Sequence, residues 1–165
     1  MARRSKEELI AEFHRLYDVF ETLKASMEPL YGPEFFKIMQ EGVVTRERML
    51  RLLTNGTANA SELLGGVQQG LNDLLETMMI ALEDTPANAN LVLAAYKEQT
   101  GRNLFDDAGN PQKVAKAIVK RGAIENDTEF YLLKEVMSNV DQTVFKESQT
   151  EKAGAMLDDY EFSKP

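Results

Sequence analysis

The sequence predicts an all-α protein, a single-domain helical bundle or array of about six to seven helices with no sheet. Apolar residues recur with alternating spacings of three and four along three long segments, which is typical of helix faces. Capping residues, prolines and glycines stand where helices should begin and end. No segment alternates apolar and polar residues as a half-buried strand would. We expect one domain over 1–165, with loose ends at 1–4 and 161–165.

The first long helix is expected to begin at Ser5, which forms a capping box with Glu8. Pro29 should end or kink it, because proline cannot donate the i→i−4 hydrogen bond. One face of this helix is wide and apolar, so it predicts either an internal core or an interface, including a homodimer interface. The residues of this face, which are also the candidate interaction residues, are Phe13, Leu16, Phe20, Leu23 and Met27.

Two shorter helices should follow the first. One covers 33–41 and stops before Gly42. The other covers 46–53, begins at the cap Thr45 and stops near Asn55, which precedes a glycine.

The second long apolar pattern, within 57–84, contains Gly65, Gly66 and Gly70. Each glycine inside a helix costs about 1 kcal/mol relative to alanine, so the glycines need a structural reason. Either the helix starts after them, or a neighbouring backbone passes close to them. We favour close packing.

The next two helices have clear boundaries. Thr85 is a candidate cap, Pro86 occupies the first helical position, and Gly101 is a candidate C′ residue. The same arrangement brackets the following helix between the cap Asn110 and Gly122.

A third long apolar pattern covers 126–144 and opens with Asn126 and Glu129. A last helix, after the cap Ser148 with Glu151, should complete the fold.

Charge is unevenly distributed along the chain. The net charge is −8. Residues 1–54 are balanced, whereas 55–165 carry all of the excess acid. This difference suggests a sub-division into a neutral part, 1–56, and an acidic part, 57–160. An acidic surface repels nucleic-acid phosphates and attracts basic proteins, although solubility alone could also explain it.

Composition excludes several kinds of chemistry. The chain has no cysteine, which excludes disulfides, thiolate nucleophiles and cysteine zinc sites and agrees with a cytoplasmic location. No apolar run is long enough to cross a membrane, so no membrane partner is expected. The basic start lacks an apolar h-region, so it does not predict a signal peptide.

Catalytic and metal-binding patterns are scarce. His14 is the one histidine, and its flanks predict a partly exposed helix residue. The segment LFDDAGNPQK, 104–113, offers Asp106 and Asp107 as candidate ligands for Mg²⁺ or Ca²⁺. It does not fit the EF-hand pattern, and a loop that turns and leads into the cap Asn110 explains it more simply. We therefore expect no enzyme activity and no cofactor.

A basic helix followed by a short turn and another helix, 111–140, resembles a helix-turn-helix in outline. The second helix begins with acidic residues, which oppose DNA binding. Under this alternative the contact residues would be Lys113, Lys116, Lys120 and Arg121.

The sequence thus favours a non-enzymatic cytoplasmic protein that binds another, basic protein, either as an acidic inhibitor of the immunity type or as a dimeric regulator or adaptor. A nucleic-acid-binding regulator is the first alternative. A carboxylate-metal enzyme centred on Asp106 and Asp107 is the second.

Overall fold

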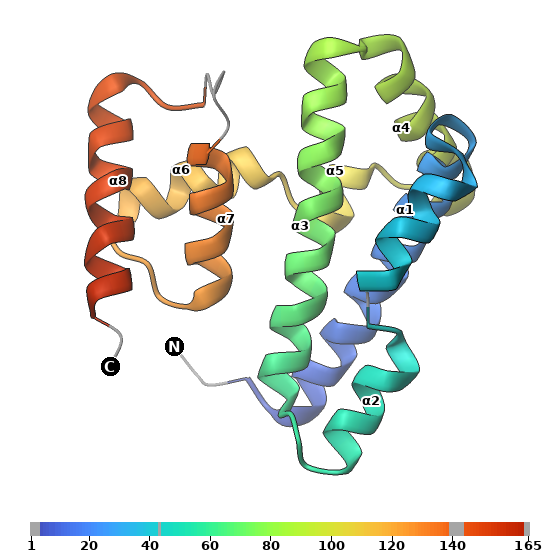
Figure 1. The fold of residues 1–165 in the computed structure, drawn as a ribbon, viewed down its shortest axis with the longest axis horizontal. Helices are drawn as coiled ribbons and strands as arrows, with labels where there is room; N and C mark the ends of the chain where they lie inside the picture. The colour runs from blue at the N-terminus through green and yellow to red at the C-terminus, as the bar shows by residue number, and fades with distance from the viewer. Residues whose placement is uncertain (1–3, 43, 139–143, 164–165) are drawn as a thin grey trace. The chain divides into compact units, whose positions relative to one another are not determined.

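The computed structural model describes residues 4–42, 44–138 and 144–163, and within these ranges the protein is all-α with no strand, as predicted (Figure 1). The helices are α1 (Lys6–Gly42), α2 (Arg46–Thr54), α3 (Ala60–Asp84), α4 (Pro86–Thr100), α5 (Leu104–Ala108), α6 (Pro111–Arg121), α7 (Asp127–Ser138) and α8 (Glu147–Phe162).

The chain divides into two compact units, unit 1 (Met1–Ala108) and unit 2 (Gly109–Pro165). Each unit has its own cluster of buried apolar side chains. The charge boundary predicted near residue 56 lies inside unit 1, between α2 and α3, so it does not coincide with the boundary between units. The single domain over 1–165 stays a prediction.

Unit 1 is built on the pairing of α1 with α3, which lie side by side in Figure 1. Helix α4 packs on both, α2 packs on α3, and α5 packs on α1 and α4. The pairing buries the 3–4 apolar faces of both long helices, with Leu74 and Met78 of α3 fully inaccessible. Each such side chain contributes roughly 1.5–3 kcal/mol through burial.

The sharp bend of α1 occurs at Gly32 rather than at the predicted Pro29. Gly32 has φ 78° and ψ 160°, a conformation that side-chain-bearing residues rarely adopt. Pro29 and Pro33 both lie within the helical ranges on either side. Proline removes one hydrogen bond, whereas positive φ redirects the chain, so the glycine sets the bend.

Most predicted caps are present. The Ser5 hydroxyl accepts from the Glu8 N–H at 3.2 Å, and the Thr45 hydroxyl accepts from the Arg48 N–H. The predicted glycines take left-handed conformations at the C-terminal ends of their helices. Further caps and C-terminal glycines found as predicted are Asn110, Asn126, Gly101 and Gly122.

Two predicted caps differ in detail from the structure. Thr85 occupies the N-cap position of α4 as predicted, but its hydroxyl donates back to the Ala81 carbonyl of α3 and makes no capping hydrogen bond. Helix α8 begins at Glu147, one residue before the predicted cap Ser148, because the Gln149 side chain accepts the Lys146 N–H.

Unit 2 consists of α6, α7 and α8. Its core includes Ala115, Leu133 and Ala153, one from each helix, all fully buried. The rings of Phe130 and Tyr160 stack at 5.3 Å between centroids. Helix α7 is described as far as Ser138, the predicted core position at 140 lies outside the described residues, and residue 144 is not helical.

The chain ends differ slightly from expectation. Helix α8 continues to Phe162, so a C-terminal loose end cannot begin at 161. Residues 1–3 and 164–165 lie outside the described ranges. No helix in the described part of the chain has the length and apolar character needed to cross a membrane.

Candidate functional site

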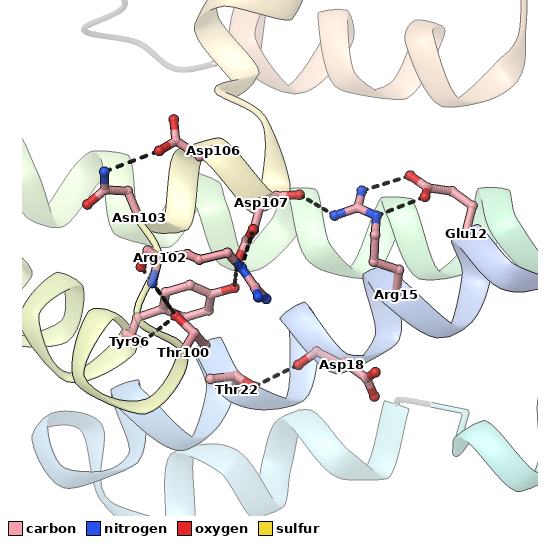
Figure 2. Close-up of polar contacts among 10 residues, drawn as sticks. All are labelled: Glu12, Arg15, Asp18, Thr22, Tyr96, Thr100, Arg102, Asn103, Asp106 and Asp107. Atoms are coloured by element: carbon pink, nitrogen blue, oxygen red, sulfur yellow. Dashed lines mark hydrogen bonds and ion pairs between the residues drawn. The ribbon is translucent and has the colours of Figure 1, made fainter.

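The predicted loop at 104–113 begins as a short helix, α5, and Asp107 fastens this helix to the rest of unit 1. Both carboxylate oxygens of Asp107 accept from the Arg102 Nε, at 2.9 and 3.0 Å. The Tyr96 hydroxyl donates to Oδ2 at 2.8 Å, and Arg15 of α1 donates to the Asp107 carbonyl at 2.8 Å. Figure 2 shows these groups converging from α1, α4 and α5.

The hydrogen bonds of this network are largely shielded from water. Tyr96 is fully inaccessible, and only 11% of the Asp107 side chain is exposed. Burial, and then the Asp107 carboxylate, raise the pKa of Tyr96, because both disfavour a phenolate. Glu12 raises the pKa of the Arg15 guanidinium through a hydrogen bond. Tyr96 and Arg15 therefore keep their protons at neutral pH, which suits a structural clamp rather than a proton-transfer site.

The metal candidates are occupied by protein partners. Asp107 already binds an arginine and a tyrosine, and Asp106 accepts from the Asn103 amide at 3.1 Å. No group of three or more His, Asp or Glu residues that could hold a metal ion occurs in the part of the chain that the structure describes. The first N–H groups of the helix that starts at Pro111 are bound by Asn110.

A groove between α1, α2 and α3 is the feature that the sequence did not reveal. Its volume is about 260 Å³, and its lining is mainly apolar. Its lining residues are Tyr17, Phe20, Val44, Met49, Gly66, Val67, Gln69, Gly70 and Asp73.

Two of the three glycines predicted to need a reason, Gly66 and Gly70, line this groove, whereas Gly65 does not. Helix α3 begins at Ala60, so Gly66 and Gly70 lie inside it, and side chains rather than a neighbouring backbone approach them. A Cβ built on Gly66 would lie 3.2 Å from the Met49 Cε, and one on Gly70 would lie 3.6 Å from the Phe20 Cε2. The contact at Gly70 is an ordinary van der Waals distance, whereas an alanine at 66 needs the flexible end of Met49 to move by a few tenths of an ångström.

The exposed face of α3 that borders the groove is acidic. Glu62, Gly66, Gln69, Asp73 and Glu76 follow spacings of three and four, so they share one helix face. Helix α3 carries five carboxylates and no lysine or arginine. A ligand lying along this face therefore meets negative charge next to apolar surface.

Beside the groove, the charge of Arg46 of α2 is matched by carboxylates of α1. Arg46 donates to Asp18 at 2.5 Å and to Glu21 at 2.9 Å, and its guanidinium lies 4.6 Å from the centre of the Tyr17 ring. The Tyr17 hydroxyl donates to the Val44 carbonyl at 3.3 Å. These contacts fix the position of α2 against α1 and hold the groove in shape.

The predicted interaction residues of the first helix are not available at the surface. They form the core of unit 1 against α3, which corrects their assignment as an interface: the apolar face is already covered within the chain. Their exposed fractions are 0% for Phe13, 4% for Leu16, 6% for Phe20, 0% for Leu23 and 0% for Met27.

The nucleic-acid candidates lie on α6, where Lys113, Lys116 and Lys120 are exposed. Arg121 instead binds Glu129 and the Ala123 carbonyl, so its charge is matched within unit 2. Glu129 raises the pKa of Arg121, as an ion-pair partner does.

His14 is half-buried beside the Phe13 ring, at 5.3 Å between ring centroids.

The chain matches no protein-family model, no curated protein and no solved structure.

Proposed function

We propose that this chain is a non-enzymatic, cytoplasmic protein that binds a basic protein partner through the groove. The observation that carries the proposal is the apolar groove bordered by the carboxylates of α3, a helix without a positive charge. Buried apolar anchors supply most of the affinity of protein interfaces, while complementary charge steers association and selects partners. The groove and its border offer both.

An acidic inhibitor that covers the basic surface of its target is the form of partner binding that fits this charge best. A dimeric adaptor, in which the occupant is a second copy, is the other form. The apolar face of α1 is buried within unit 1, so it lends a dimer no support.

Site-specific photo-crosslinking in cells tests the proposal. A photoreactive phenylalanine derivative replaces Gln69, which lines the groove, and in a control it replaces Asn90, an exposed residue of α4 outside the lining. We expect position 69 to capture a basic protein, identified by mass spectrometry, and the yield of this adduct in cell lysate should fall as salt is added before irradiation. An adduct with a second copy would select the dimeric form. No adduct at 69, or the same adducts at 69 and 90, would contradict the proposal.

A further inference from the structure

We infer that the groove receives one apolar side chain presented by a basic segment of the partner, and that the absence of side chains at Gly66 and Gly70 leaves room for it. This inference rests on the proposed function and names the chemistry of the partner at the same site. It requires that the groove fit a side chain, that the glycines lack a reason within the fold, and that the border favour cations.

The size of the groove suits a single anchor side chain. Its volume of about 260 Å³ falls below the range of roughly 300–1,000 Å³ that is typical of pockets for drug-sized ligands. Its walls are contributed by Phe20, Met49 and Val67, which offer apolar contact, while Val44 at the edge is 39% exposed. An apolar side chain placed there removes this surface from water.

The fold itself does not require glycine at positions 66 and 70. Neither residue has a positive φ, and both lie inside a helix, where alanine is the more stable residue. A methyl group at position 70 would make ordinary contact with Phe20, and one at position 66 would meet only the flexible end of Met49. Such methyl groups would instead occupy the groove, so the space beside the glycines has value for an occupant.

The border of the groove favours positive charge. Asp73 lines the groove, and Glu76 lies three residues further along the same face. On the opposite side Arg46 is held by two carboxylates, and Arg51 of α2 lies 3.4 Å from Glu47. Arg48 is also exposed on α2. Because the arginines lie on the α2 side and the carboxylates lie on α3, a basic segment is expected to approach along α3. Its lysines or arginines would flank the apolar anchor.

Selection from a random peptide library displayed on phage tests this inference. Peptides are selected on the full-length wild-type chain and rescreened on the double variant Gly66→Ala/Gly70→Ala. We expect the selected peptides to share one apolar residue flanked by Lys or Arg. Their binding to the double variant should weaken by about tenfold, as overpacking of an occupied site does.

The control variant is Gly154→Ala in α8, where a Cβ meets nothing within 4 Å. All three alanines should raise the melting temperature, because each removes a helix glycine. Only those at the groove should reduce peptide binding. If the double variant melts lower than the wild type, Gly70→Ala alone replaces it, since its Cβ makes only an ordinary contact.

The inference is overturned if no peptide distinguishes the double variant from the wild type, or if the selected peptides lack basic residues. Its failure differs from failure of the proposed function. A partner captured at position 69 that is insensitive to the glycine substitutions would leave the proposed function standing and remove the inference. The absence of any capture at position 69 would remove the proposed function itself.

Discussion

Both units of the molecule contain a tyrosine that donates to an aspartate at 2.8 Å, Tyr96 to Asp107 in unit 1 and Tyr160 to Asp127 in unit 2. In the first pair Tyr96 is fully inaccessible and only 11% of the Asp107 side chain is exposed, whereas Tyr160 is partly exposed and Asp127 is exposed. Water can replace a lost partner at the exposed pair but not at the buried one, so equal geometry implies unequal energy. Burial, more than distance, decides which polar contacts hold this fold together.

The hydrophobic cores of the two units differ in size. Among the described residues, the core cluster of unit 1 contains 19 buried side chains, and that of unit 2 contains eight. Small cores bury a smaller fraction of their surface and are marginally stable. We therefore expect unit 2 to be the less stable of the two.

Removing a core leucine from each unit should have the largest effect. Leu74→Ala and Leu133→Ala each create a cavity at a fully buried position and should cost about 2–5 kcal/mol. Hydrogen exchange followed by mass spectrometry should show faster exchange in α6–α8 for Leu133→Ala, with α1 and α3 unchanged. Faster exchange in both units would mean that they unfold as one.

Removing the two tyrosine hydroxyls tests the comparison directly. Tyr96→Phe leaves the buried Asp107 short of a donor and should cost about 1–3 kcal/mol, whereas Tyr160→Phe should cost less than about 1 kcal/mol. Urea unfolding of the two variants measures the difference. Equal losses would show that burial does not separate the pairs.

The same tyrosine predicts a loss of stability in alkali. The folded state raises the pKa of Tyr96 through burial and the Asp107 carboxylate, so it favours the protonated phenol. The resulting stability is fully present below the unfolded pKa of about 10 and is lost as pH rises above it. Tyr96→Phe should flatten this part of the pH profile, as measured by unfolding from neutral to alkaline pH. An unchanged profile would assign the loss to other groups.

The smallest expected effect is the binding of nucleic acid. The lysine face of α6 is followed by Glu125, Asp127 and Glu129, and Arg121 is paired within unit 2. We expect no stable complex with duplex DNA even at low salt, in a gel-shift or anisotropy assay. A complex that Lys116→Glu/Lys120→Glu abolishes would support the nucleic-acid alternative instead.

Helix caps were predictable from the sequence, whereas the packing between residues distant in the chain was not. Ser5, Thr45 and Asn110 cap their helices as predicted, because a cap involves only residues two or three positions away. The bend was assigned to Pro29 instead of Gly32, because the sequence does not show which residue takes a positive φ.

The candidate sites also depended on packing that the sequence does not show. The spacing of the α1 apolar face predicted a buried or binding surface, but only the packing of α3 shows that the surface is internal. The glycines at 66 and 70 were the one signal of the groove in the sequence. Their meaning depended on Met49 and Phe20, which are distant in the chain.

The affinity of the captured partner for two charge-matched variants tests the central claim most directly. Asp73→Asn/Glu76→Gln removes two carboxylates from the border of the groove, and Glu34→Gln/Glu98→Gln removes two exposed carboxylates from α1 and α4. We expect the first variant to bind the partner about tenfold more weakly and with less sensitivity to salt, and the second to bind with wild-type affinity. Equal affinities for the two variants would contradict the claim.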